Sequence, residues 1–123
     1  MRLGKNAVTP NEAFARLVGA RLTSVQFVMD YLILGFDERG ALTTLVWPEV
    51  RLSGGRLRFG DAGYRDALCS LIPQTTIRVE FDEQETLRCD FDGEASMFIE
   101  FGSDTTGGER GILTGPRHFL FVL

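Results

Sequence analysis

The sequence has few of the residues on which catalytic and metal sites are usually built. Its 123 residues include one histidine, His118, and two cysteines, Cys69 and Cys89. A zinc site needs clustered Cys and His ligands, and a Ser-His-Asp or Cys-His mechanism would have to use His118. The sequence contains neither a Gly-x-Ser-x-Gly motif nor a phosphate loop that ends in Gly-Lys-Ser/Thr. We therefore expect a nonenzymatic protein with no cofactor and no metal site.

Long apolar runs are also lacking. The longest, 31–34 and 119–123, are far shorter than the roughly 20 residues that span a bilayer. The first six residues are not followed by the apolar segment and cleavage site of a secretory signal. Without an export signal, two cysteines are weak evidence for a disulfide, so we interpret both as buried free thiols. We expect a cytoplasmic protein that does not enter a membrane.

An excess of positive charge is absent too. The net charge of −4 argues against a nucleic-acid-binding protein, which usually carries a basic excess to neutralise phosphates. Residues 1–73 carry nine basic and seven acidic side chains, whereas residues 74–123 carry four and ten. The net charges of the two parts are therefore +2 and −6, a polarity that favours self-association or a basic partner.

Length and composition predict one folded domain over residues 1–123. Apolar residues make up 44% and charged residues 24%, which is typical of globular proteins and excludes disordered and fibrous classes. Most segments are rich in β-branched and aromatic residues and are separated by turn residues. The fold class we predict is α+β, with a mainly antiparallel sheet or half-open barrel of about 7–9 strands and two short helices.

Two segments have the features of short helices. Over 9–18, Thr9 is suited to the N-cap and Glu12 to the N3 position of a capping box. Over 61–72, Asp61 is suited to the N-cap, apolar residues recur at helical spacing, and a proline follows.

The remaining segments predict strands and their connections. Strands alternate apolar and polar residues and end at Gly, Pro, Asn or Asp, whereas flexible loops are polar and have no periodicity. We predict a first meander over 22–47, a hairpin over 50–59, a second meander over 76–101, a flexible glycine-rich loop over 102–115 and a last strand over 119–122.

The two meanders resemble each other at an offset of 55 residues. This offset places 32–37 over 87–92, and each of these segments ends in a Phe-Asp turn. Upstream it places Leu22 over Ile77. A true duplication predicts two β-meanders joined by the hairpin and helix of 50–72.

Core positions also carry a resemblance to a known family. They are Leu17-Val18-Gly19 followed by Leu22 and Val25, then 30–36, and later 63–72 leading into the second meander. On these residues the chain resembles a family of small bacterial domains of unknown function with two β-meander halves. The resemblance covers most of the chain, implies an uncharacterised bacterial protein and brings no established catalytic residues.

Arginines form the most unusual local pattern. Arg51, Arg56 and Arg58 alternate with apolar residues in the 50–59 hairpin and should project from one face, with Arg65 nearby. Guanidinium groups bind phosphates or carboxylates in bidentate fashion, so this face is a candidate contact for an anion or an acidic protein. The alternative is that the charges only block edge-to-edge aggregation.

Other candidate interaction residues are aromatic or charged. Tyr31 and Trp47 are candidate interface anchors, although core packing is the more frequent fate of a ring on a strand. Glu83 and Glu85 belong to an acidic run over 80–94, which lacks the calcium-loop pattern and is most simply a solvated face.

The sequence leaves three functions open. The preferred one is a nonenzymatic bacterial domain for protein–protein interaction, assembled as a homodimer or other small homo-oligomer through a sheet edge or an aromatic patch. One alternative is an immunity-like or antitoxin-like partner whose acidic 80–94 segment masks a basic toxin. The other is a small-ligand receptor or enzyme with a pocket beside Arg117 and His118.

Overall fold

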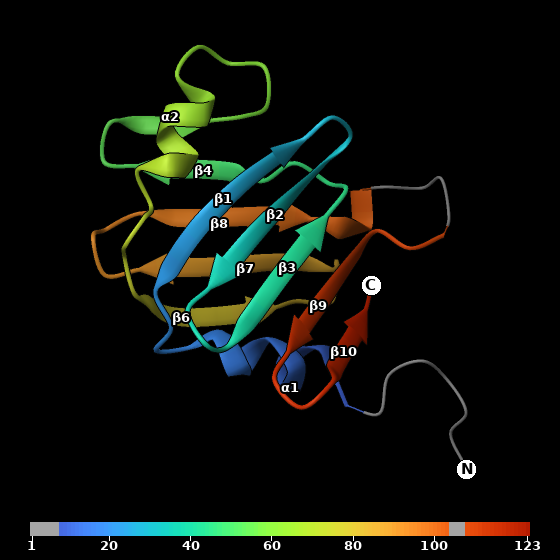
Figure 1. Ribbon diagram of the computed structural model, residues 1–123. Helices are drawn as coiled ribbons and strands as arrows, with labels where there is room; N and C mark the ends of the chain where they lie inside the picture. Colours follow the sequence, from blue (N-terminus) through green and yellow to red (C-terminus); the bar gives the residue numbers. More distant parts are fainter. Residues whose placement is uncertain (1–7, 104–107) are drawn as a thin grey trace.

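The computed structural model describes residues 8–103 and 108–123, which form two five-stranded antiparallel sheets packed face to face (Figure 1). Short helices lie at opposite ends of the two sheets. The predicted α+β class with two short α-helices is confirmed. The number of strands was underestimated, because the described residues form ten strands in two separate sheets rather than 7–9 in one sheet or half-open barrel.

The strands follow the predicted meanders and hairpins. The first sheet has the order β1-β2-β3-β9-β10 and the second has the order β5-β4-β8-β7-β6. In chain order the strands are β1 Leu22–Val28, β2 Tyr31–Phe36, β3 Gly40–Thr44, β4 Glu49–Leu52, β5 Gly55–Leu57, β6 Thr76–Phe81, β7 Thr86–Phe91, β8 Ser96–Glu100, β9 Gly111–Gly115 and β10 Phe119–Val122.

The first helix has the predicted cap. In α1 (Pro10–Phe14), Thr9 Oγ1 accepts a hydrogen bond from the backbone N–H of Glu12 at 3.2 Å. The Glu12 carboxylate in turn accepts one from the N–H of Thr9 at 2.8 Å. This capping box satisfies two N–H groups that the helix itself cannot pair. A 3-10 turn, η1 (Ala15–Leu17), follows directly.

The second helix begins later than predicted. In α2 (Tyr64–Cys69) the N-cap is Gly63, whose φ of 84° lies in the left-handed region. The prediction that Asp61 caps this helix is wrong. Its side chain instead accepts a hydrogen bond from the N–H of Arg58 at 2.7 Å and closes the turn before the helix.

One strand was missed. The segment 102–115 was predicted to be a flexible loop, but it contains the 3-10 turn η2 (Phe101–Ser103) and strand β9. β9 pairs with β3, about 70 residues earlier in the chain, and no local sequence pattern predicts a pairing between segments so far apart. Residues 104–107 of the predicted loop lie outside the described residues. The first six residues, which were considered as a possible export signal, lie outside them as well.

The two halves of the chain exchange hairpins. The β1-β2-β3 meander of the first half pairs with the β9-β10 hairpin of the second, and β6-β7-β8 pairs with the β4-β5 hairpin of the first. Near the middle, the N–H of Leu22 donates to Gln74 O and the N–H of Thr76 donates to Ala20 O. These reciprocal bonds flank a bridge between Arg21 and Thr75 and mark a pseudo-twofold relation between the halves.

The strand registers extend the predicted repeat and correct it. Before the first hairpin turn of each half the offset is 54, so Leu22 corresponds to Thr76 and not to Ile77. After that turn the offset is 55, as predicted. Both meanders have a register shift at the same place, between Leu22 and Ser24 and between Thr76 and Arg78. The repeat thus includes the helices and hairpins as well as the meanders.

The core lies between the sheets and separates the two cysteines. Alternate residues of the central strands, such as Leu34 and Met97, point inward and are fully buried. Cys89 is buried, and desolvation, together with the charge of Asp90, raises the pKa of its thiol to about 12. Cys69 is exposed on α2, so the prediction of two buried thiols is wrong for this residue.

This difference predicts how the thiols react. In the native protein a thiol reagent such as DTNB should modify Cys69 within minutes, because its side chain is exposed to the reagent. Under native conditions Cys89 should react at least about 100-fold more slowly than Cys69, because its thiol becomes accessible only when the protein unfolds. The absorbance of the released chromophore gives the number of reactive thiols before and after urea is added. Rapid modification of two thiols in the native state would contradict the placement of Cys89 in the core.

Candidate functional site

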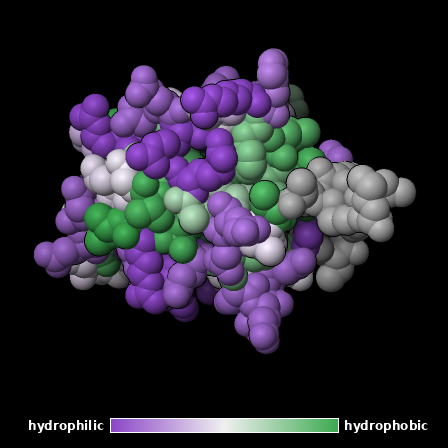
Figure 2. All heavy atoms as spheres, turned by 90° about the horizontal axis from the view of Figure 1, so that it is seen from below, coloured by the Kyte–Doolittle hydropathy of each residue, from purple (hydrophilic) through white to green (hydrophobic). Residues whose placement is uncertain are grey.

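The two ends of the molecule differ in how they are closed. At the α1 end, Phe14 stacks on Phe81 at 5.6 Å between ring centroids and meets Phe121 edge-on at 6.0 Å. The Asn11 side chain of α1 donates to Phe81 O at 3.0 Å and accepts from its N–H at 2.9 Å. Phe14 and Phe121 are buried, and Phe81 is half-buried. Figure 2 shows this end of the molecule as hydrophilic over most of its area, with two hydrophobic patches. The rings of Phe14 and Phe121 are therefore closed off from solvent.

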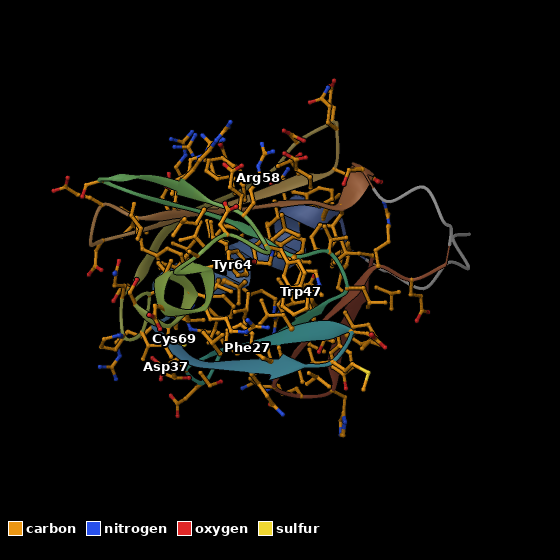
Figure 3. All side chains as sticks on the ribbon, turned by 90° about the horizontal axis from the view of Figure 1, so that it is seen from above. Phe27, Asp37, Trp47, Arg58, Tyr64 and Cys69 are labelled. Atoms are coloured by element: carbon orange, nitrogen blue, oxygen red, sulfur yellow. The ribbon has the colours of Figure 1, made fainter. Side chains whose placement is uncertain are left out.

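The α2 end carries a second set of aromatic rings, of which Phe59 is exposed, Phe27 and Trp47 are half-buried and Tyr64 is buried. Phe27, the pseudo-twofold equivalent of Phe81, stacks on Trp47 at 6.5 Å, and Trp47 stacks on Phe59 at 4.6 Å. Phe59 meets Tyr64 edge-on at 6.0 Å and is 54% exposed. Figure 3 shows Trp47 between the two sheets, with Phe27 on one side and Arg58 and Tyr64 on the other.

A groove runs along each side of the Trp47–Phe59 stack. On the second-sheet side it has a volume of about 260 Å³ and includes Glu49 and Arg58. On the first-sheet side it has a volume of about 230 Å³ and is bounded by Arg65. We call the two together the aromatic groove. The residues that line it are Phe27, Val28, Met29, Val46, Trp47, Glu49, Arg58, Phe59, Arg65, Phe98, Glu100 and Ser103.

Tyr64 holds the Trp47 segment in place. Its hydroxyl donates a hydrogen bond to the backbone carbonyl of Pro48 at 2.5 Å, from the first turn of α2. Burial raises the pKa of Tyr64, so its hydroxyl remains protonated and able to donate near neutral pH. The loop that carries Trp47 is therefore tied to the helix, and the groove exists before any ligand arrives.

Glu49 fixes the other wall. Its carboxylate is only 8% exposed and is paired with Arg51 Nε at 2.5 Å and Arg58 Nε at 3.0 Å. Burial raises the pKa of Glu49, but the hydrogen bonds and charges of the two arginines outweigh it, so the pKa lies below its usual range. Arg51 also lies over the ring of Phe98 at 3.9 Å. These contacts hold Arg58 at the edge of the groove.

Neutralising Glu49 should weaken the fold in a pH-dependent manner. A lowered folded-state pKa gives stability that is present above the unfolded value of about 4.5 and lost as the pH falls through the folded value. Glu49→Gln should lower the free energy of unfolding by about 1–2 kcal/mol at pH 7. In urea titrations the difference from the wild type should shrink as the pH falls below 4.5, and a pH-independent difference would contradict the ion pairs.

Three predicted interaction residues meet at the groove. Trp47, Arg58 and Arg65 all border Phe59, although Arg65 lies beside Phe27 at 5.6 Å rather than with the other arginines. Arg51 and Arg56 are opposite each other on β4 and β5, outside the groove.

Sequence reasoning missed Phe27, Glu49 and Phe59 as members of the groove. The predicted hairpin over 50–59 includes Phe59 in its second strand, but β5 ends at Leu57, which leaves this ring beyond the strand. The signal available in the sequence was the proximity of Phe59 to the glycines at 60 and 63, which favour a turn over a strand.

The other predicted interaction residues lie elsewhere. Tyr31 is half-buried in β2, Glu83 is exposed in the β6–β7 turn, and Glu85 pairs with Arg110 at 2.5 Å. Arg117 and His118 are exposed in the β9–β10 turn, each with a φ of 61°.

Two arginines neutralise part of the acidic 80–94 segment. Glu80 pairs with Arg78 and Asp90 pairs with Arg88, both at 2.9 Å. Over 8–103 and 108–123, no group of three or more His, Cys, Asp or Glu side chains is arranged to hold a metal ion. Within the same ranges, no helix has the length and apolar character needed to cross a membrane.

Comparison with known proteins adds no relative. No protein-family model, curated protein or solved structure matches the chain. The resemblance to a bacterial family of unknown function therefore stays a prediction, and the functional argument rests on the geometry of the site.

Proposed function

We propose that the protein is a nonenzymatic binding domain that takes an extended segment of another protein into the aromatic groove. The observation that carries this proposal is the difference between the two pseudo-twofold-related ends. The same fold buries Phe14 and Phe121 under α1, with Phe81 half-buried beside them, yet leaves Phe59 more than half exposed beside α2. Since the α1 end shows that this architecture can bury aromatic rings, the exposure of Phe59 at the other end favours a role in binding.

The chemistry of the groove favours a peptide segment. Aromatic residues and arginine are the commonest anchors of protein interfaces, and aromatic-lined grooves accept extended segments with apolar or proline side chains. Trp47 and Phe59 offer flat apolar surfaces, while Arg58 and Arg65 offer N–H donors at the two margins. Such donors suit the backbone carbonyls or a carboxylate of the bound segment.

A displayed library of random peptides, selected on the wild-type protein, tests the proposal. Selected peptides should contain apolar or proline residues, and their binding should change the fluorescence of Trp47, the single tryptophan. Phe59→Ala should weaken them at least about 10-fold, because an exposed interface ring typically contributes more than about 1.4 kcal/mol.

The matched control is Ile77→Ala, because Ile77 is 57% exposed, close to the 54% of Phe59, and lies on β6 rather than in the groove. This substitution should leave peptide affinity unchanged. Selection of no binding peptide, or of peptides that bind Phe59→Ala as tightly as the wild type, would sink the proposal.

A further inference from the structure

The outer face of the first sheet carries no charge on its two central rows. One row crosses all five strands through Gln26, Ile33, Thr43, Ile112 and Val122. The neighbouring row crosses them through Ser24, Gly35, Ala41, Thr114 and Leu120. We call these ten positions the uncharged face. All are exposed or half-buried, and Leu120 is 54% exposed.

The equivalent face of the second sheet is highly charged. The strand registers match nine positions of the uncharged face with one position each there, for example Ile33 with Arg88 and Thr114 with Arg51. The tenth, Val122, corresponds to Arg58, which directly follows β5. Eight of these ten equivalents are charged. In the order of the two rows they are Glu80, Arg88, Phe98, Glu49 and Arg58, then Arg78, Asp90, Ser96, Arg51 and Arg56.

This contrast separates what the fold requires from what it does not. The second sheet shows that the architecture accepts arginine, aspartate and glutamate at these positions. The first sheet therefore has no structural need to exclude them. A surface that is depleted of charge and carries exposed apolar side chains is typical of the core of a protein interface.

We propose that the uncharged face binds the same face of a second copy of this chain, forming a twofold homodimer by sheet-on-sheet packing. Each copy carries a net charge of −4, so two copies repel least where neither presents a charge. A twofold contact is self-complementary by symmetry, and an uncharged face suits another uncharged face better than it suits the charged sheet. The inference is independent of the aromatic groove, which lies at the α2 end.

Substitution by the equivalent residue of the other sheet supplies the test. Ile33→Arg and Thr114→Arg each introduce the arginine that the second sheet carries at that position, Arg88 and Arg51 respectively. Thr114 is exposed, so its replacement makes little demand on the core. Ile77→Arg places the same charge at a site outside the uncharged face and serves as the control.

Sedimentation velocity over roughly 1–100 µM, a range in which micromolar dimers dissociate, is the measurement. We expect the wild type and Ile77→Arg to shift from monomer to dimer over this range. Ile33→Arg and Thr114→Arg should weaken the dimer at least about 10-fold while keeping the circular dichroism spectrum of the wild type. A wild type that remains monomeric throughout would overturn the proposal, as would a folded Thr114→Arg variant that dimerises as tightly as the wild type.

Discussion

Replacing Gly40 by alanine is expected to lower the free energy of unfolding by at least about 4 kcal/mol. Gly40 opens β3 with a φ of 135°, a conformation that residues with a side chain rarely adopt. A Cβ there would overlap the backbone carbonyl oxygen of Thr114 on the neighbouring strand β9. The only relief is to move β9 away from β3, which breaks the pairing between the two halves of the chain.

Gly55→Ala is the matched control for this experiment. Gly55 has a φ of 137°, but no atom lies within 4 Å of the position that its Cβ would occupy. Gly55→Ala therefore introduces backbone strain but no steric overlap, and it should lower the free energy of unfolding by only about 1 kcal/mol. Urea denaturation followed by circular dichroism gives both values, and equal losses would show that the close approach of β9 to Gly40 is not what limits this position.

Phe14→Ala is the second substitution with a large expected effect, a loss of about 3–5 kcal/mol. The ring of Phe14 is fully buried and contacts Phe81 of the second sheet and Phe121 of the first. Its removal leaves a cavity between the sheets that α1, held by the Asn11 side chain, cannot easily fill. The variant should unfold at a much lower urea concentration than the wild type.

The same change at the other end should have a different effect. Phe59→Ala removes a ring that is 54% exposed, so it should change the free energy of unfolding by less than about 1 kcal/mol while weakening peptide binding at least about 10-fold. Phe14→Ala should retain peptide affinity in whatever fraction remains folded. If Phe59→Ala destabilises the protein as much as Phe14→Ala does, the α2 end is part of the core and not a binding surface.

Local interactions made much of the fold predictable from the sequence. The capping box of Thr9 and Glu12 depends on residues three apart and was identified correctly. The β2–β3 and β7–β8 hairpins were recognisable because alternating apolar residues flank short turns. The prediction that Asp61 caps the second helix was wrong because a residue suited to capping a helix also suits a tight turn. Here Asp61 closes the turn that precedes Gly63.

Long-range pairings could not be predicted in the same way. Strand β9 contains few apolar residues between flanking glycines, and it is stabilised by pairing with β3 and β10 rather than by its own propensity. The exchange of hairpins between the halves depends on that same pairing. The repeat was visible at an offset of 55, but the change to 54 upstream is apparent only once the registers are known.

The candidate site was predictable only in part. Trp47 was a candidate as an aromatic interface anchor and Arg58 as part of the arginine pattern of the hairpin, but nothing in the sequence brings Trp47 close to Phe27 or Arg58 close to Trp47. Glu49 lies outside the segments predicted from the sequence, and only the structure shows it nearly buried between Arg51 and Arg58. Sites built from several distant segments require the fold before their members can be listed.

The most direct test of the proposed function uses the indole N–H of Trp47, whose side-chain NMR resonance is unique because the chain has one tryptophan. A selected peptide is titrated into ¹⁵N-labelled protein. We predict that the indole resonance and the amide resonances of Phe59 and Arg65 shift together and saturate at the same peptide concentration. An indole resonance that stays in place while residues of the α1 end or of the 80–94 segment shift would contradict the account.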